Sequence, residues 1–255
     1  MSNALIGYTG FVGSTILRQT NIFDALYRST NIHDIRQRAF EMIVCAGAPA
    51  QKWIANREPD KDRSNIERLI DCLQTVDCQH FILISTVDVF KSPIGVDELS
   101  PVEETGLHPY GLHRRLLEKF VEARFPQHLI VRLPGLVGPG LRKNVIYDLL
   151  HHNNLHAVDS RGIFQFYPMV NLWRDIQIAR EAGLSLVHLT AEPISVADVA
   201  LHGFGRTFAQ QLDGVPARYD MQTKLAALFG AQGRYQYSAR ESIMAIRCYA
   251  QSEPR

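Results

Sequence analysis

A glycine-rich turn near the start of the chain most constrains what it can fold into. In the stretch LIGYTGFVGSTILRQT, from Leu5 to Thr20, three glycines follow one another at intervals of three residues, directly after an apolar run. A strand that enters a helix through such a turn leaves the first amide groups of the helix without partners, and these groups favour an anion. Gly7 would permit the tight turn, Gly10 the close approach of a pyrophosphate, and Gly13 close packing of helix on strand. An ordinary glycine-rich turn is the alternative interpretation.

Apolar runs alternate with longer helical patterns along most of the chain. Four runs have the near-continuous apolar character of strands buried on both faces: 42–47, 81–86, 129–135 and 186–190. Three helical patterns lie between them: 61–76, 110–125 and 171–182. This alternation predicts an α/β fold, a doubly wound parallel sheet of the Rossmann type. The alternation ends after residue 135, and residues 193–255 predict a small helix-rich C-terminal region with one or two short strands.

The length of 255 residues suits one large domain or a domain with a small appendage. We assign residues 1–135 with about 171–190 to a dinucleotide-binding domain, and about 136–170 with 191–255 to a substrate-binding region. A net charge of +1 gives no general attraction to nucleic acid or membrane. No apolar run has the length of a membrane span, no signal-peptide pattern is present, and the four cysteines lack metal-ligand spacing. We therefore expect a cytoplasmic protein that binds neither nucleic acid nor membrane.

Three stretches reach the carboxyl edge of the predicted sheet, where open α/β sheets bind ligands: ISTVDVF (84–90), HPYGLHRRLLEKF (108–120) and RLPGLVGPG (132–140). Tyr110 and Arg114 are one helical turn apart and share a helix face. A tyrosine hydroxyl has a pKa of about 10, and a cation beside it lowers that pKa and makes the hydroxyl a usable general acid or base. In the alternative interpretation, Tyr110 is only an aromatic residue at a helix start and Arg114 pairs with Glu118.

These stretches together resemble the extended short-chain dehydrogenase/reductases, which include sugar-nucleotide epimerases, dehydratases and reductases. ISTVDVF resembles the Ser-Ser/Thr-x-x-Val-Tyr/Phe segment of that family. Glu104 resembles the acidic residue before their Pro-x-x-x-Tyr-Gly stretch, and EPISVADVA (192–200) resembles their Phe-Ile-x-Val-x-Asp-Val-Ala segment. The resemblance covers most of the chain and is strongest to the dTDP-4-dehydrorhamnose reductase-like members, which share the short second crossover.

The resemblance implies that Tyr110 is the catalytic acid or base, with Thr86 as its hydrogen-bonding partner and Arg114 as the cation beside it. Relatives carry a lysine four residues after the tyrosine, where this chain has Arg114. Arginine keeps the positive charge and can bond a ribose, but its pKa is too high for it to release a proton. Proton relay to solvent would therefore need water or a neighbour such as His113.

The expected cofactor depends on the end of the second strand. Sites that prefer NAD place an acidic residue there, to hold the ribose 2′-hydroxyl. This chain has ALYRST, in which Arg28 and Ser29 suit a 2′-phosphate, so we expect NADP, with NAD as the alternative. By the resemblance, Pro134 would lie near the nicotinamide. The complete expected set of cofactor-binding residues is Gly7, Thr9, Gly10, Phe11, Val12, Gly13, Arg28, Ser29, Ala46, Gly47, Ala48 and Pro134.

We assign substrate binding to Asp88, Arg142 and Lys143. The two basic residues follow the Gly-Pro-Gly turn and could meet the diphosphate of a nucleotide sugar, although basic surface residues are common.

Three further features carry weaker signals. The histidines of HHNNLH include a pair, His152 and His156, at a spacing that zinc can use. No acidic third ligand is obvious nearby, so we expect a polar helix end and no metal site. Trp53 and Trp173 are expected to be packing residues.

The sequence therefore predicts an NADP-dependent oxidoreductase or epimerase that acts on a sugar nucleotide or a similar keto or hydroxy substrate. A hydride would be transferred while Tyr110 moves a proton. The alternative is a non-catalytic NADP-binding regulator or sensor with the same fold. Helices at 61–76 and 110–125 could pair with those of a second copy, so a homodimer is among the expected assemblies.

Overall fold

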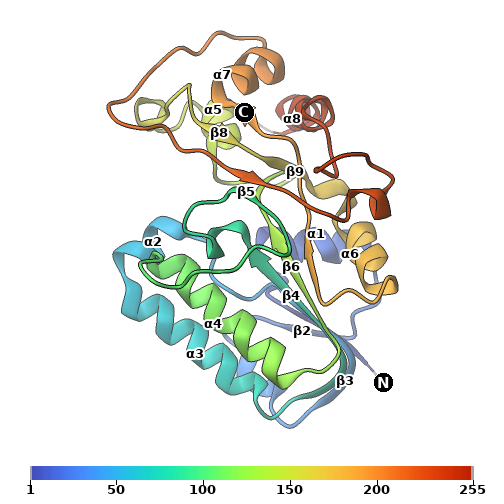
Figure 1. Ribbon diagram of the computed structural model, residues 1–255. Helices are drawn as coiled ribbons and strands as arrows, with labels where there is room; N and C mark the ends of the chain where they lie inside the picture. The colour runs from blue at the N-terminus through green and yellow to red at the C-terminus, as the bar shows by residue number, and fades with distance from the viewer. Residues whose placement is uncertain (1, 254–255) are drawn as a thin grey trace. The chain divides into compact units, whose positions relative to one another are not determined.

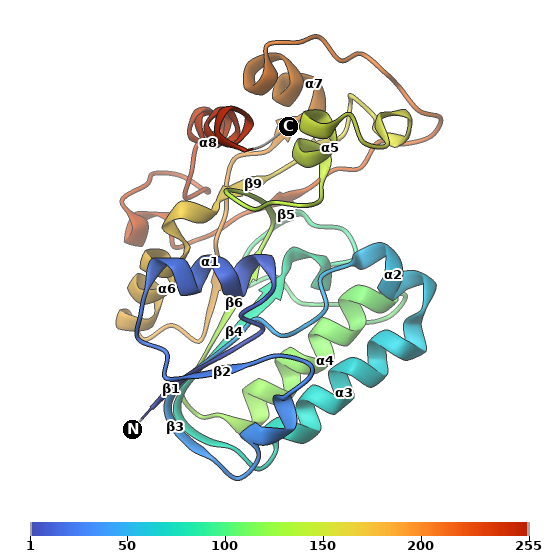
Figure 2. The ribbon, with the colours of Figure 1, turned by 180° about the vertical axis from the view of Figure 1, so that it is seen from behind.

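The computed structural model describes residues 2–253, which divide into two compact units (Figures 1 and 2). The first unit contains the chain up to Lys91, Pro101–Arg132 and Leu172–Val187. The second contains Ser92–Ser100, Leu133–Asn171 and the chain from His188 onward. Each unit is therefore assembled from segments that lie far apart in the sequence.

The first unit is built on a six-stranded parallel sheet in the order β10-β6-β4-β3-β1-β2. Its strands are β1 (Asn3–Ile6), β2 (Ala25–Tyr27), β3 (Ala39–Cys45), β4 (Asp77–Thr86), β6 (His128–Leu133) and β10 (Leu186–His188). Strand β1 lies between β2 and β3, and its residue Leu5 is in register with Leu26 on one side and Val44 on the other. This order confirms the predicted doubly wound α/β fold, whose ligands bind beyond the carboxyl ends of the strands.

Helices cover both faces of this sheet (Figures 1 and 2). One face carries α3 (Pro59–Leu73) and α4 (Pro109–Arg124), and the other carries α1 (Phe11–Gln19) and α6 (Leu172–Glu181). A short helix, α2 (Lys52–Arg57), precedes α3. The link from β2 to β3 contains only a 3-10 turn, Ile32–Ile35, in agreement with the short crossover of the sequence.

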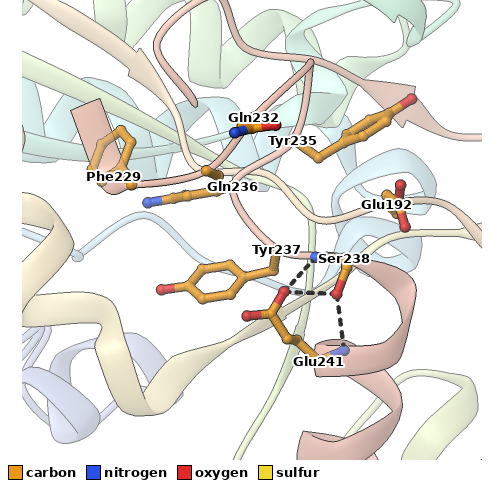
Figure 3. Close-up of a pocket in the computed structure, with 10 residues that line it drawn as sticks. Glu192, Phe229, Gln232, Tyr235, Gln236, Tyr237, Ser238 and Glu241 are labelled. Atoms are coloured by element: carbon orange, nitrogen blue, oxygen red, sulfur yellow. Dashed lines mark hydrogen bonds between the residues drawn. The ribbon is translucent and has the colours of Figure 1, made fainter. Parts of the chain in front are cut away.

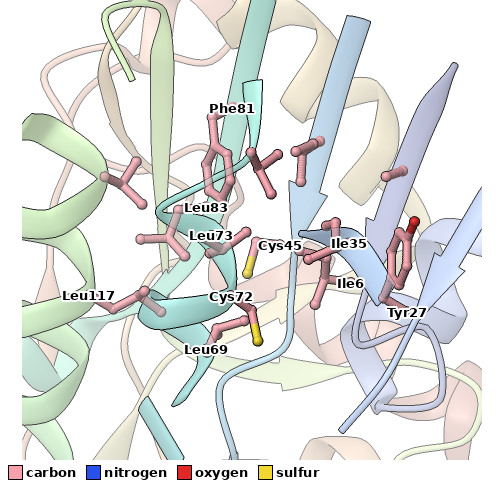
Figure 4. Close-up of a cluster of buried hydrophobic side chains, with 14 of the residues drawn as sticks. Ile6, Tyr27, Ile35, Cys45, Leu69, Cys72, Leu73, Phe81, Leu83 and Leu117 are labelled. Carbon is pink, nitrogen blue, oxygen red and sulfur yellow. The ribbon is translucent and has the colours of Figure 1, made fainter. Parts of the chain in front are cut away.

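The main apolar core lies between the sheet and the α3–α4 layer. Ile6, Cys45 and Leu83 extend from three neighbouring strands toward Leu69 and Cys72 of α3 (Figure 4). All five side chains are at most 6% exposed. The continuous apolar runs in the sequence reflect this burial, since strands of a parallel sheet are covered on both faces. The core fixes the strand ends on which the candidate site is built.

The second unit consists of short strand pairs and a few helices. The strand pairs are β7 (Gly135–Val137) with β9 (Phe166–Pro168), β8 (Ile163–Phe164) with β11 (Ile194–Ser195), and β5 (Ile94–Val96) with β12 (Asp220–Met221). The helices are α5 (Val145–His151), α7 (Val196–Asp198), which continues as the π-helical segment Val199–Gly203, and α8 (Ala239–Ser252). Short 3-10 turns occupy Val87–Val89 in the first unit and Leu155–Ala157, Met169–Asn171 and Ala226–Phe229 in the second. Two strands therefore lie beyond residue 193, as predicted.

His152 and His156, which have a spacing that zinc can use, do not lie on one helix. Helix α5 ends at His151, and His152 follows it in a left-handed conformation with φ of 52°. The two histidines therefore do not share a helix face. Across residues 2–253, no group of three or more histidine, cysteine, aspartate or glutamate side chains is arranged to hold a metal ion.

The two tryptophans differ in their surroundings. Trp173 is 7% exposed and packs edge-on against Phe23, as expected of a packing residue. Trp53 is 63% exposed, with the Arg57 guanidinium 4.8 Å from the ring centroid, so its expected packing role is wrong.

In the part of the chain that the structure describes, no helix has the length and apolar character needed to cross a membrane.

Candidate functional site

The turn between β1 and α1 needs its three glycines for different reasons. Gly7 has a φ of +83°, and a Cβ on it would lie 2.3 Å from the carbonyl oxygen of Ala46. A Cβ on Gly13 would lie 2.2 Å from the carbonyl oxygen of Gly7. The backbone itself therefore requires glycine at both positions. A Cβ on Gly10 would meet no protein atom closer than 3.4 Å, so the empty space at Gly10 is not needed for packing.

The N-terminus of α1 fits an anionic group. Gly10 is its N-cap residue, and no side chain caps the helix. No acidic residue lies in the first turn, where Phe11 and Val12 are partly exposed and Thr9 is exposed just before it. Amide groups without a capping acceptor and the positive end of the helix dipole both favour phosphate. The space left by Gly10 would allow a diphosphate to approach this backbone.

The other residues expected at a dinucleotide follow neighbouring strands. Arg28 and Ser29 are exposed directly after β2, and the Arg28 Nε donates a hydrogen bond to the Thr30 hydroxyl at 2.9 Å. Residues 46–48 follow β3 and are partly exposed. These groups share the carboxyl edge of the sheet with the glycine turn. Pro134, also expected at the cofactor, is a buried residue of the second unit.

Tyr110 is buried at the start of α4, and its hydroxyl is hydrogen-bonded to the side chain of Thr86 at the end of β4. A Cβ on Gly111 would lie 2.0 Å from the carbonyl oxygen of Asp88, so only glycine allows α4 to begin this close to the segment after β4. The N–H of Tyr110 donates to Asn56 Oδ1 of α2 at 3.0 Å, which fixes the same end of α4. The structure therefore brings Thr86, Asp88 and Tyr110 together, as expected.

Arg114 lies over the ring of Tyr110, with its guanidinium carbon 4.0 Å from the ring centroid. Asp62 of α3 receives hydrogen bonds from both terminal nitrogens of Arg114, one of them 2.9 Å long. The carbonyl oxygen of Pro49 accepts another hydrogen bond from the guanidinium, which is only 3% exposed. The alternative expectation that Arg114 pairs with Glu118 is therefore wrong.

Glu118 belongs to a separate buried network. Arg132 of β6 binds both of its carboxylate oxygens, at 3.0 and 2.8 Å, and the Ser85 hydroxyl donates to it at 2.6 Å. Arg115 adds a contact of 2.9 Å. Burial alone would raise the pKa of Glu118, but the hydrogen bonds and charge of Arg132, with Ser85 and Arg115, outweigh it and leave that pKa below its usual value. Glu118 thus connects α4 to β4 and β6.

The net effect of the surroundings on Tyr110 is opposite to the expected one. Burial raises the pKa of Tyr110, and the nearby charge of Asp88 raises it further. The charge of Arg114 and the hydrogen bond from Thr86 lower this pKa, but by less than burial raises it. The expectation that the adjacent cation leaves Tyr110 with a lowered pKa is therefore wrong, because the burial of the side chain outweighs the charge of Arg114.

His113 does not provide a route to solvent. Its side chain is buried, and its Nδ1 lies 2.7 Å from the same Asp62 carboxylate that binds Arg114. The expectation that His113 relays protons to solvent is therefore wrong.

Two basic side chains, those of Lys52 and His108, lie near the Asp88 carboxylate. Lys52 Nζ lies 2.6 Å from Asp88 Oδ1, and His108 Nε2 lies 4.0 Å from the same oxygen. The His108 Nδ1 accepts a hydrogen bond from the N–H of Gly111 at 3.0 Å. Burial lowers the pKa of His108, and the charge of Lys52 lowers it further. Four residues of the site were not predicted from the sequence: Lys52, Asn56, Asp62 and His108. Only His108 had a signal in the sequence, because it precedes a proline at a helix start.

The expected substrate-binding cations lie in the second unit. Arg142 and Lys143 are exposed in the segment that precedes α5. This unit also contains a pocket of about 330 Å³ near the start of α8 (Figure 3). Glu192, Tyr235 and Glu241 are among its lining residues, and none of the residues expected at the cofactor or substrate lines it.

Comparison with solved structures shows what this fold is similar to. The dTDP-4-dehydrorhamnose reductase of Clostridium acetobutylicum matches with a TM-score of 0.75 at 16% identity, over 98% of this chain and 99% of that one. The Bacillus anthracis dTDP-4-dehydrorhamnose reductase, solved with NADP, matches with a TM-score of 0.72 at 17% identity, over 99% and 98%. The Bordetella bronchiseptica enzyme WbmG, solved with NAD and UDP, matches with a TM-score of 0.74 at 12% identity, over 98% and 93%.

These structures are extended short-chain dehydrogenase/reductases, so the chain has the fold that the sequence motifs predict. No protein-family model matches the sequence, and no curated protein does. At such low identity the likeness concerns the fold, and any activity must be argued from the residues of the site.

Proposed function

We propose that this protein is an extended short-chain dehydrogenase/reductase that uses NADP to reduce, oxidise or epimerise a sugar nucleotide or a similar keto or hydroxy compound. The observation that supports this most is the hydrogen-bonded pair of Tyr110 and Thr86, at the same sheet edge as the glycine turn. The similar structures that name NADP, or NAD with UDP, support a nicotinamide cofactor and a nucleotide-linked substrate.

The residues of the first unit fit a dinucleotide. The N-terminus of α1 at Gly10 would hold the diphosphate, and Arg28 with Ser29 would hold a 2′-phosphate. We propose that the first unit is the dinucleotide-binding domain and that the second, with Arg142 and Lys143, binds the substrate. When bound, the nicotinamide would supply or accept the hydride.

Tyr110 would transfer the proton. Its pKa is raised by burial from an ordinary value of about 10, so the hydroxyl is protonated near neutral pH and has a proton to donate to a substrate oxygen. Thr86 would orient that oxygen, and Asp88 would contact a neighbouring hydroxyl of the substrate. Arg114 holds the ring of Tyr110 from one face, and we propose that it also meets the ribose.

The decisive experiment removes the Tyr110 hydroxyl. In Tyr110→Phe the ring remains, so packing against Arg114 and the affinity for cofactor should change little. The rate of NADPH oxidation with a 4-keto sugar nucleotide should fall by about 10²–10⁴-fold, the usual contribution of a positioned acid. Absorbance of NADPH gives the rate, and fluorescence titration gives the affinity. Full activity in Tyr110→Phe would remove Tyr110 from the mechanism.

A second function is favoured by a specific observation. Arg114 is balanced by Asp62, and Tyr110 has a raised rather than lowered pKa, which is unfavourable for a base. Neither feature would impair a regulatory protein that binds NADPH and responds to whether its site is occupied, because such a protein transfers no proton. Tight NADPH binding without turnover of any 4-keto sugar nucleotide would support this regulatory function over the enzymatic one.

We also propose that the protein works in the cytoplasm and forms a homodimer through α3 and α4. Light scattering of the purified protein tests the second proposal: a mass near twice 28.8 kDa is expected. A monomer at micromolar concentration would rule out a stable dimer.

A further inference from the structure

A second pocket of the second unit lies where three helical segments meet. It has a volume of about 500 Å³, within the range of sites for small ligands. It is lined by the end of α5, by the π-helical segment after α7 with the residues that follow it, and by the C-terminal half of α8 (Figures 1 and 2). None of the residues assigned above to the cofactor, the substrate or the proton transfer lines this pocket.

The charged side chains that line this pocket are basic. No aspartate or glutamate is among the described residues of the lining, which include two arginines and two histidines: Arg206, Arg247, His152 and His202. The carboxylate of Asp198 lies 4.0 Å from His202 Nε2, but Asp198 is not part of the lining. A guanidinium stays charged at all relevant pH values. The pocket therefore favours an anion over a neutral molecule or a cation.

Arg206 is half-buried without a carboxylate to balance its charge. Among residues 2–253 no acidic side chain pairs with it, and burial lowers its pKa with no opposing effect. Two other arginines that are buried or half-buried do have such a partner, since Arg132 binds Glu118 and Arg161 binds Asp159. Removing a charge from water is costly unless a group of opposite charge binds it. An anion in the pocket would supply that group for Arg206.

Both arginines are held in place by a helix end. Arg206 Nη2 donates to the carbonyl oxygen of Leu149 near the end of α5, and Arg247 Nε donates to the carbonyl oxygen of His202 at 2.6 Å. Such bonds satisfy the last carbonyl groups of a helix, and they use one nitrogen of each guanidinium. The other nitrogens of the two guanidinium groups have no hydrogen-bond partner among the described residues. They are the planar donors that bind phosphate oxygens in pairs.

The rest of the lining is mainly apolar. Leu149, Leu150 and Ala250 are buried, Phe204 is half-buried, and Leu201 is 49% exposed. Covering an exposed apolar side chain with an apolar part of a ligand removes it from water and is favourable. The lining therefore suits a molecule that joins an anionic group to an apolar body.

We propose that this pocket binds an organic phosphate, whose phosphate group is held by Arg206 and Arg247 and whose apolar body packs on Leu201 and Phe204. A phosphate monoester carries more than one negative charge near neutral pH and has three acceptor oxygens, so it can accept hydrogen bonds from two guanidinium groups at once. His152 and the other histidine of the lining can each donate one further N–H. The inference goes beyond the proposed function and does not depend on it.

The test titrates the protein with phenyl phosphate in the absence of cofactor and substrate. Leucine is labelled with ¹³C at its methyl groups, and Leu201→Ile identifies the NMR signals of Leu201, which then report on this pocket. Phenyl phosphate should shift these signals until they saturate, and inorganic phosphate should bind more weakly because it lacks the apolar body. Benzyl alcohol, which has a similar body and no charge, should leave the signals unchanged.

Two variants test the guanidinium groups. Arg206→Met and Arg247→Met should each weaken the binding of phenyl phosphate by about tenfold or more, because each removes a charge-assisted hydrogen bond. Arg240→Met is the matched control, because Arg240 is an exposed residue of α8 that does not line the pocket. Its dissociation constant should equal that of the wild type. If a methionine variant does not fold, the lysine variant at the same position replaces it and should also bind more weakly, since lysine cannot donate two parallel hydrogen bonds.

Three outcomes would overturn the proposal. If phenyl phosphate at millimolar concentration does not shift the Leu201 signals, the two arginines serve only to hold their helix ends. If Arg206→Met and Arg247→Met bind phenyl phosphate as tightly as the wild type, the guanidinium groups do not hold the phosphate. Equal affinity for phenyl phosphate and inorganic phosphate would replace the organic ligand by free phosphate. None of these measurements involves oxidation of NADPH, so a failure of the proposed function would leave their result unchanged.

Discussion

At the scale of single residues, Asp62 determines where two side chains of α4 lie. Its carboxylate is 5% exposed and binds both Arg114 and His113. A buried guanidinium is tolerated only because a carboxylate balances its charge and accepts its hydrogen bonds. The position of Arg114 over the Tyr110 ring thus depends on a residue of α3, not on the α4 sequence alone.

Replacing Asp62 tests this dependence. Asp62→Asn would leave the Arg114 guanidinium buried without a balancing charge, so the free energy of unfolding should fall by about 3–5 kcal/mol. Urea denaturation measures this loss. Asp71→Asn is the matched control, because Asp71 pairs with Arg36 at the surface, where both side chains are about half exposed. That pair should contribute only about 0–1 kcal/mol. Equal losses in the two variants would contradict the role given to Asp62.

Arg28 should decide between the two forms of the cofactor. Its side chain is exposed at the end of β2, near no acidic partner among residues 2–253, and a hydrogen bond to a charged group contributes about 1.5–3 kcal/mol. Arg28→Ala should therefore weaken NADPH binding by about tenfold or more and change NADH binding little. Titration of both cofactors by fluorescence gives the two affinities. Equal losses for NADPH and NADH would show that Arg28 supports the fold instead.

At the scale of elements, the glycines of the turn between β1 and α1 have different roles, since Gly13 is needed for packing and Gly10 for binding of the cofactor. Gly10→Val should fold normally and lose cofactor affinity, because a side chain there meets no close protein atom but fills the space before the helix N-terminus. Gly13→Val should instead destabilise the fold, because its Cβ would lie 2.2 Å from a backbone carbonyl oxygen. Thermal unfolding and cofactor titration of both variants distinguish the two effects. Unchanged NADPH affinity in folded Gly10→Val would mean that the glycine serves only the turn.

The regular elements of the first unit were predictable because their signals are local. Continuous apolar runs gave β3, β4 and β6, and Pro109 marks the start of α4. Helix α2 and strand β5 were missed for a physical reason. Only one residue of α2 is buried. Strand β5 has just three residues, two of which pair with β12, more than a hundred positions away along the chain. Patterns of apolar residues carry no information about such partners.

The same limit applies to the site. The sequence predicted that Thr86, Tyr110 and Arg114 lie together, because the end of a strand and one turn of a helix can both be recognised from local patterns. The partner of Arg114 lies 52 positions away, on another helix, and no local pattern relates the two. The pKa of Tyr110 was mispredicted for the same reason, because the burial that raises it arises from tertiary packing.

At the scale of the whole molecule, buried ion pairs make stability depend on pH. Glu118 is fully buried against Arg132, and its pKa in the folded protein lies below its value in the unfolded chain. The ionised carboxylate therefore favours the folded state. This stabilisation is complete above the unfolded pKa, which is about 4.3, and is lost as pH falls through the lower folded value.

Glu118→Gln should accordingly lower the free energy of unfolding and also change how that free energy depends on pH. Near neutral pH the variant leaves the Arg132 guanidinium buried without its carboxylate, so the free energy of unfolding should fall by about 3–5 kcal/mol. Below about pH 4.3 the wild-type protein loses the contribution of Glu118 and the variant has none to lose, so the two curves should converge. Urea denaturation at a series of pH values gives both curves. Glu67→Gln, at a surface pair with Arg63, serves as the control and should follow the wild-type curve closely. A difference in the free energy of unfolding between Glu118→Gln and wild type that stays constant at all pH values would contradict this prediction. It would show that Glu118 stabilises the fold by packing and not by its ionised carboxylate.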